Sequence, residues 1–182
     1  MNDTQNKIAE KIREISLLGL TDKATDHSYD LIYPSLLEKY IDRKINILEV
    51  GIGKGGNLLI LSQLFPGATI YGIDYANNLR IETKNTNIII LPPMDQSDPE
   101  MLRYLPMLDI VMEDASHNYT KSMATFNLLH PLLSPGSLYI IEDIYPEFFD
   151  LYSNDQRFIV KDARHIKGRQ DDVIAYYEHT NN

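Results

Sequence analysis

The sequence predicts a doubly wound α/β fold with a mostly parallel, seven-stranded sheet and an N-terminal helical segment. Short apolar runs alternate with segments of helical periodicity, which is typical of strand–helix–strand units. Several of these runs are apolar at nearly every position, as expected for strands that are buried on both faces of a parallel sheet. A glycine-rich segment, G-I-G-K-G-G at residues 51–56, follows the first run, where such a strand should turn into a helix.

The first half of the chain begins with helical patterns and continues with strands. Ile8, Ile12 and Ile15 recur at helical spacing before Gly19, so the first helix should cover residues 8–18 and stop there. Pro34 near the start of the next pattern is compatible with a second helix. The elements expected after the first helix are a helix at 29–40, a strand at 45–50, a helix at 57–65 that ends at Pro66-Gly67, and strands at 69–73 and 87–91.

The second half continues the alternation of strands and helices and then ends in two strands without a long helix between them. The expected elements are a short helix at 100–104, a strand at 109–112, a helix at 120–129, a turn at 131–136, a strand at 138–141, and a final β pair at 157–161 and 173–177. We see no repeat and no composition change that would mark a second domain. Residues 1–182 are therefore expected to form one domain, with a helical segment at 1–44 and the core sheet at 45–182.

Composition excludes several classes of protein. The net charge of −9 argues against a general binder of nucleic-acid backbones, which carries basic stripes. The chain has no cysteine, which excludes disulfides, thiolate catalysis and cysteine-ligated zinc. The first residues are polar, and no apolar run approaches a membrane span. We therefore expect a soluble, cytoplasmic protein.

The glycine-rich segment predicts a ligand that approaches the backbone closely. Its spacing fits two patterns: G-x-G-x-x-G of dinucleotide binders, and E-x-G-x-G-x-G of S-adenosylmethionine (SAM) binders, which begins at Glu49. Asp74 closes the next strand, where an acid can bind both ribose hydroxyls. A bare strand–helix turn is the structural alternative.

Three features favour SAM over a dinucleotide. Glu49 precedes the loop, where its carboxylate can reach the amino group of the cofactor. The third strand leads to Asp95 and Gln96, which suit the edge of an adenine, although these residues could instead cap the next helix. The chain also ends in a short β pair, where a dehydrogenase would need a second substrate-binding region.

Two apolar strands end in acids, Asp114 after one and Glu142-Asp143 after the other. If the strands are neighbours, these three carboxylates converge at the edge where ligands bind in open α/β sheets. Like charges ~4 Å apart repel by about 4 kcal/mol at an effective dielectric near 20, so the cluster must hold a proton or a cation. All-oxygen ligands favour Mg²⁺ over Mn²⁺ or Ca²⁺.

His117 follows Asp114 by one short turn and is the candidate general base. A cation can lower the pKa of a bound hydroxyl, and a positioned base adds typically 10²–10⁴ in rate. The structural alternatives are a helix cap for Asp114, a solvated strand end for Glu142-Asp143 and an ordinary loop histidine for His117. Glu113 should point away from Asp114, because adjacent strand residues alternate faces.

Taken together, these motifs resemble the metal-dependent sugar O-methyltransferases of macrolide and aromatic-polyketide pathways, of the mycinamicin and tetracenomycin rhamnosyl type. The resemblance covers roughly residues 20–145. It rests on Leu20-Thr21-Asp22-Lys23, His27, Tyr29, Tyr33, the segments 47–53 and 71–74, Asp95-Gln96-Ser97-Asp98, Glu113-Asp114-Ala115-Ser116-His117 and Ile141-Glu142-Asp143. Leu20 and Ala115 stand where the family has glycine, and the segment 145–156 after the fifth strand is short.

The resemblance implies a Rossmann-like class I methyltransferase fold, SAM as methyl donor and Mg²⁺ held by Asp114, Glu142 and Asp143. It also implies His117 as the base, with Asp114 as the rival. The predicted cofactor-binding residues are Glu49, Gly51, Gly53, Gly55, Asp74, Tyr75, Asp95, Gln96 and Glu113. The family methylates antibiotic sugars, and the same core occurs in methyltransferases of other glycans.

We therefore predict a SAM-dependent, Mg²⁺-assisted O-methyltransferase that acts on a hydroxyl of a sugar, glycoside or similar small polyol. The expected partner is a small-molecule or glycan acceptor, without nucleic acid or membrane, and the sequence leaves a homo-oligomer open. Two other functions remain as alternatives: a nicotinamide-dependent oxidoreductase that uses the same glycine loop, and a non-catalytic SAM-binding partner protein.

Overall fold

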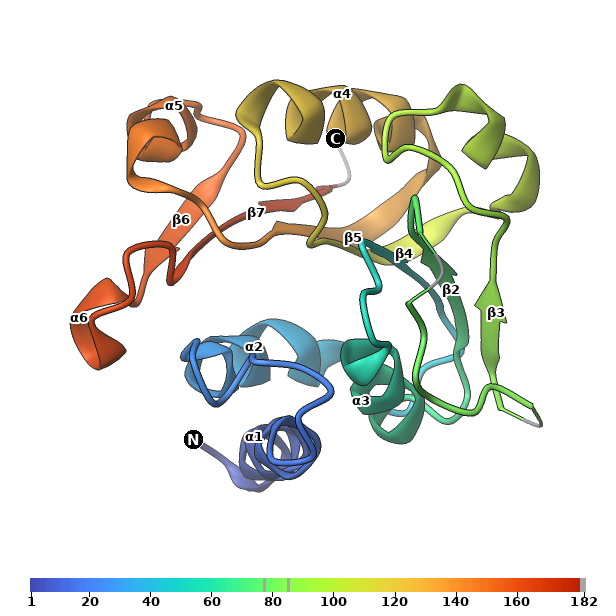
Figure 1. Ribbon diagram of the computed structural model, residues 1–182, viewed down its shortest axis with the longest axis horizontal. Coiled ribbons are helices and arrows are strands. Elements are labelled where there is room, and N and C mark those ends of the chain that lie inside the picture. The colour runs from blue at the N-terminus through green and yellow to red at the C-terminus, as the bar shows by residue number, and fades with distance from the viewer. Residues whose placement is uncertain (77, 85, 181–182) are drawn as a thin grey trace.

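The computed structural model describes residues 1–76, 78–84 and 86–180, which form a seven-stranded sheet covered by helices on both faces (Figure 1). The strand order is β3-β2-β1-β4-β5-β7-β6, and the strands are β1 (Asn46–Val50), β2 (Thr69–Ile73), β3 (Ile88–Ile90), β4 (Leu108–Glu113), β5 (Leu133–Ile141), β6 (Ile159–Asp162) and β7 (Val173–Glu178). The pairs from β3 to β5 are parallel, whereas β7 runs antiparallel to both β5 and β6. The predicted fold class is confirmed.

The helices form two layers. The α1, α2 and α3 helices lie on one side of the sheet, and α4 and α5 lie on the other (Figure 1). Their bounds are α1 (Asp3–Ser16), α2 (Tyr29–Leu37), α3 (Gly56–Leu64), α4 (Tyr119–Leu129), α5 (Phe149–Ser153) and α6 (Arg164–Lys167), with 3-10 turns at Glu38–Tyr40, Pro99–Tyr104, His130–Leu132 and Pro146–Phe148. None of the helices in the described part of the chain is long and apolar enough to cross a membrane.

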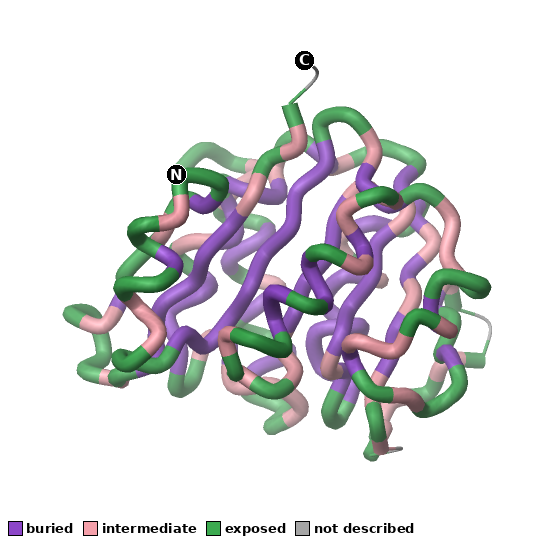
Figure 2. The backbone as a smooth tube through the Cα atoms, turned by 90° about the horizontal axis from the view of Figure 1, so that it is seen from above, coloured by how far each residue is buried: buried purple, intermediate pink, exposed green. Residues whose placement is uncertain are grey.

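The first helix shows why these elements form where they do. The side chain of Asn2 caps α1 by accepting a hydrogen bond from the Gln5 N–H, and the Gln5 side-chain oxygen accepts one from the Asn2 N–H. Its Ile8, Ile12 and Ile15 side chains are all buried. They join an apolar cluster with α2, α3 and the adjacent face of the sheet, while a second cluster fills the opposite face. The central strands are therefore buried along most of their length (Figure 2).

The structure departs from the predicted elements in three places. The predicted turn at 131–136 is wrong from Leu133 onward, because β5 already begins there. The β4–β5 pairing shifts register after Leu108↔Leu133 and resumes at Ile110↔Leu138, which absorbs the Pro135-Gly136 segment as a bulge. The helix predicted at 100–104 is a 3-10 helix, and the short helices α5 and α6 were not predicted.

Candidate active site

A cleft of about 1060 Å³ opens at the carboxyl ends of β1, β2 and β4. The strand order reverses at β1, which pairs with β2 on one side and with β4 on the other, and ligands of doubly wound sheets bind at such a point. Residues of the segment that joins α1 to α2 cover one side of the cleft. The predicted site residues that line it are Glu49, Gly51, Gly53, Asp74, Tyr75, Asp95, Gln96 and Asp114.

The glycine loop after β1 packs directly against the backbone of Asp114 and Ala115, which follow β4. Gly51 has φ +91°, and a Cβ at this position would lie 2.1 Å from the carbonyl oxygen of Asp114. Only glycine fits there. Gly55 instead caps α3 at φ +90°, and a Cβ on it would meet Leu79 and Ile81, so this predicted cofactor-binding residue lies outside the lining of the cleft.

Glu49 offers an unsatisfied carboxylate to the cleft. Its side chain is 1% exposed, and its Oε2 atom has no hydrogen-bond partner among the described residues. Burial raises the pKa of Glu49 to about 8, although the nearby Lys23 ammonium opposes the shift. A ligand with a positively charged amino group would satisfy this carboxylate, as the methionine end of SAM would.

Asp74 lies across the glycine loop at the end of β2. Its Oδ2 accepts a hydrogen bond from the Gly53 N–H at 3.0 Å, and its Oδ1 accepts one from the Ala76 N–H at 3.1 Å. These bonds fix the carboxylate at the rim of the cleft, where it can accept hydroxyl hydrogens from a ribose. Tyr75, next to it, lines the same rim and is 81% exposed.

Two polar residues after β3 complete the opposite wall. Asp95 forms an ion pair with Lys121 of α4 at 3.0 Å, and Gln96 is buried. The Gln96 amide donates a hydrogen bond to Glu113 Oε1 at 2.9 Å. Glu113 itself lies outside the cleft lining, on the α4 face of the sheet, because side chains alternate along β4. Burial raises the pKa of this carboxyl to about 7.

The acids at the ends of β4 and β5 are gathered around a lysine. β4 pairs with β5 in register Glu113↔Ile141, which places Asp114 beside Glu142. The Lys23 ammonium, from the segment before α2, donates to Asp114 Oδ2 at 2.9 Å and also contacts Glu142 Oε2. Burial alone would lower the pKa of Lys23, but Asp114, Glu142 and Glu49 outweigh it and hold the pKa well above its ordinary value.

Two tyrosines of α2 donate hydrogen bonds to Asp143 and to Glu142, which Lys23 also contacts. The Tyr29 hydroxyl donates to Asp143 Oδ1 at 2.5 Å, and the Tyr33 hydroxyl donates to Glu142 Oε1. The rings lie one helical turn apart and stack at 5.4 Å between centroids. These contacts orient the acids before any ligand arrives.

His117 lies on the other side of Asp114, with its Nε2 atom 4.0 Å from Asp114 Oδ1. Its ring meets Tyr145 edge-on, and its buried Nδ1 has no hydrogen-bond partner in the described part of the chain. Ligand atoms of Asp114, His117 and Asp143 all lie within 4.8 Å of one another. Both His117 and Asp143 have positive φ, 52° and 53°, which is uncommon outside glycine.

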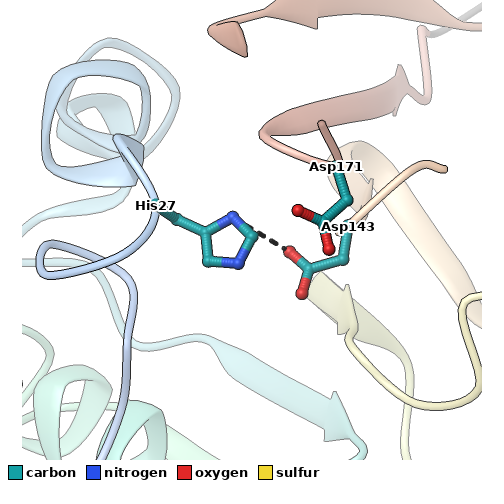
Figure 3. Close-up of side chains that lie close together, drawn as sticks. All are labelled: His27, Asp143 and Asp171. Carbon is teal, nitrogen blue, oxygen red and sulfur yellow. Dashed lines mark ion pairs between the residues drawn. The ribbon is translucent and has the colours of Figure 1, made fainter. Parts of the chain in front are cut away.

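His27 also contacts the acid cluster, which consists of Asp114, Glu142 and Asp143 (Figure 3). It projects from the segment before α2 toward Asp143, which follows β5, and Asp171, which precedes β7. The His27 Nδ1 atom is 3.4 Å from Asp143 Oδ1, and the ring is fully buried. Asp171 is already paired with Arg169 at 2.6 Å.

The donor set fits a hard divalent cation. Burial, and then the charge of Asp114, raises the pKa of Asp143 to about 6, and burial raises the pKa of Glu142 well above its ordinary range. The ionised forms of these two carboxylates are therefore disfavoured even with Lys23 present, and a further positive charge would stabilise them. Carboxylate oxygens are the ligands that Mg²⁺ prefers.

Comparison with known proteins agrees with this geometry. No protein-family profile matches the chain. It is 32% identical over 152 residues to 8-demethyl-8-α-L-rhamnosyl tetracenomycin-C 2′-O-methyltransferase of Streptomyces olivaceus, over 75% of this chain and 39% of that protein. It is 29% identical over 157 residues to demethylmacrocin O-methyltransferase of Streptomyces fradiae, over 79% of this chain and 39% of that protein. The chain thus spans about two fifths of the length of these relatives.

Solved structures carry the same architecture. The mycinamycin-pathway methyltransferase MycE, in complex with Mg, SAH and mycinamycin VI, matches with a TM-score of 0.72 and 24% identity over 94% of this chain and 55% of that one. An O-methyltransferase from Bacillus cereus in complex with SAH matches with a TM-score of 0.64 and 15% identity over 98% of this chain and 92% of that one. The fold is that of a class I methyltransferase. The predicted resemblance to macrolide and tetracenomycin sugar O-methyltransferases is confirmed.

Sequence reasoning missed the residues that surround the acids. Lys23, His27, Tyr29 and Tyr33 were noticed only as parts of a family motif and were given no role. The sequence does contain a signal of a functional site here, because a lysine, a histidine and two tyrosines lie close together in residues 23–33. Their partners lie 91 to 119 residues further along the chain, so only the fold brings them together.

Glu49 should make the stability of the protein depend on pH. Its pKa is about 8 in the folded state against an ordinary 4.5, so between these values the folded state holds a proton that the unfolded chain has released. The free energy of unfolding should therefore fall as pH rises through this range, by at most about 1.4 kcal/mol per pH unit. Denaturant unfolding at several values between about pH 5 and pH 8 should give a shallower slope for Glu49→Gln than for the native protein. Glu10→Gln, at an exposed position on α1, serves as the control, and an unchanged slope in Glu49→Gln would contradict the assignment.

Proposed function

We propose that this protein is a SAM-dependent, Mg²⁺-assisted O-methyltransferase that acts on a hydroxyl of a sugar, glycoside or similar small polyol. The observation that carries the proposal is the acid cluster of Asp114, Glu142 and Asp143, which lies beside His117 at the edge of a cleft suited to SAM. The similarity to sugar O-methyltransferases supports the same function. The acceptor would be a small molecule or glycan, and we expect the reaction in the cytoplasm, within a single domain and without nucleic acid or membrane.

The residues of the cleft have distinct roles in this proposal. Glu49 would bind the amino group of the cofactor, the loop at Gly51 and Gly53 would leave room for its methionine end, and Asp74 would bind the ribose. Asp95 and Gln96, which line the same cleft, would bind the adenine edge. The close approach of Gly51 to Asp114 brings the cofactor loop next to the acid cluster, so that donor and acceptor would meet there.

Asp114, Glu142 and Asp143 would hold the cation, which, when bound, lowers the pKa of an acceptor hydroxyl. The acceptor proton would then pass to His117, whose ring nitrogen lies within reach of the same space. Asp114 is the rival base, but its carboxylate would be needed to hold the cation.

The direct test measures binding and transfer separately. Calorimetry should detect SAM and SAH binding, and NAD⁺ binding should be absent at the same concentrations. Incubation with SAM carrying a labelled methyl group, across a panel of rhamnosides, other glycosides and polyols, should yield a methylated acceptor. Excess EDTA should remove the activity, and added Mg²⁺ should restore it. Full activity in excess EDTA, or binding of NAD⁺ but not SAM, would refute the proposal.

Replacement of His117 by glutamine should reduce kcat by about 10²–10⁴-fold, the usual contribution of a positioned base. The amide of glutamine keeps polar atoms but cannot take up the proton. SAM affinity should change little, because His117 lies outside the lining of the cofactor cleft. A variant with native kcat would transfer the role of base to Asp114.

A further inference from the structure

Lys23 already occupies the position of a cation in the acid cluster. The lysine is 1% exposed, and its ammonium lies between Asp114, which follows β4, and Glu142, which follows β5. An unpaired ammonium is very costly to bury, so these carboxylates are what allow the side chain to be there. The same two carboxylates are expected to bind Mg²⁺.

Both oxygens of Glu142 already have a partner. Its Oε2 contacts Lys23, and its Oε1 accepts from the Tyr33 hydroxyl. Asp114 gives one oxygen, Oδ2, to Lys23, while its Oδ1 faces His117 at 4.0 Å. A divalent cation bound to both Asp114 and Glu142 would lie close to the Lys23 ammonium, which contacts the same two carboxylates, and the two positive charges repel each other.

We propose that Lys23 is a built-in counter-ion of the acid cluster, and that a divalent cation binds by expelling the Lys23 ammonium from between Asp114 and Glu142. This inference rests on the proposed function, because it concerns the cation that the function requires. In the metal-free protein the lysine keeps the acids together and limits their mutual repulsion. In the metal-bound protein the cation takes over that role.

Expulsion of the lysine couples the metal to the cofactor cleft. Leu20, Thr21 and Asp22, immediately before Lys23, line that cleft. Gly56, at the start of α3, packs so tightly against this segment that a Cβ would lie 2.5 Å from the Leu20 carbonyl oxygen. Movement of the segment that carries Lys23 would therefore shift residues that line the cofactor cleft. Metal and SAM should each change the affinity of the protein for the other by the same factor.

Chemical labelling of the native protein tests the expulsion directly. A small amine-acylating reagent, followed by mass spectrometry, should leave Lys23 unmodified in EDTA and modify it several-fold faster in saturating Mg²⁺. Lys39, at the surface, should react at the same rate in both conditions. Equal protection of Lys23 in EDTA and in saturating Mg²⁺ would overturn the inference.

Metal binding to a variant gives the second test. Electron paramagnetic resonance with Mn²⁺ as the probe should show binding about tenfold tighter or more in Lys23→Met than in the native protein, since no ammonium competes. Lys39→Met removes the same charge far from the cluster and should bind Mn²⁺ as the native protein does. Thermal unfolding with and without Mn²⁺ shows whether Lys23→Met is folded. If it is not, the labelling of the native protein decides.

The outcomes separate this inference from the proposed function. Native-like or weaker Mn²⁺ binding by folded Lys23→Met would overturn the role of Lys23 and leave the metal-assisted reaction intact. Absence of Mn²⁺ binding in both proteins would contradict the metal role itself, and the inference with it.

Discussion

Replacement of Asp114 by asparagine is expected to abolish metal-dependent methyl transfer while SAM binding is retained. The amide keeps the shape of the side chain but removes the charge that faces the proposed cation, the Lys23 ammonium and His117. Loss of a charge that organises a catalytic cation costs several kcal/mol, so turnover should fall by about 10³-fold or more. Steady-state kinetics over a series of Mg²⁺ concentrations would measure this effect, and calorimetry with SAH would measure cofactor binding.

The Asp114→Asn experiment needs a control of equal charge change. Asp150→Asn, at an exposed position of α5, makes the same substitution away from the cleft and should keep native kinetics. If Asp114→Asn turned over at a native rate in EDTA, the acid cluster would have no part in catalysis. If it lost SAH binding and turnover together, Asp114 would belong to the cofactor site instead.

The second large effect is expected from alanine at Gly51. The new Cβ would lie 2.1 Å from the Asp114 carbonyl oxygen, 2.5 Å from its carbonyl carbon and 2.7 Å from the Ala115 Cα, all of them backbone atoms that cannot rotate away. The residue would also keep a φ of +91° that side chains rarely adopt. Backbone overlap and strain together should cost about 3 kcal/mol or more.

Gly51→Ala should therefore unfold at lower denaturant concentration and lose measurable SAM binding. Gly67→Ala is the matched control, because its Cβ would meet only ordinary contacts, 3.6 Å from the Arg43 carbonyl oxygen. It should keep native stability and cofactor affinity. Native SAM affinity in Gly51→Ala would mean that the loop can retreat from β4 without cost.

The sequence was sufficient for the sheet and for the acids at its edge. Apolar runs place β1, β2, β4 and β5, because a strand buried on both faces has few polar positions. The acids that follow β4 and β5 then meet for a reason of topology, since neighbouring parallel strands end at the same edge. Glu49 was predicted from the glycine-loop pattern that it begins, and Asp74 from its position after the next strand.

The lysine and the two tyrosines that contact the acids could not be assigned to them from the local sequence pattern. Lys23, Tyr29 and Tyr33 reach their partners only after the α2 helix packs against the sheet, and nothing in their own segment specifies that contact. The early start of β5 was hidden by Pro135-Gly136, which usually mark a turn but here lie in a bulge.

The left-handed backbone of His117 and Asp143 has a consequence for laboratory evolution. Each residue is held in a conformation that glycine or asparagine would adopt at lower cost. A library selected only for resistance to heat should therefore collect glycine and asparagine at positions 117 and 143. Under the proposed function, such variants would gain stability and lose activity.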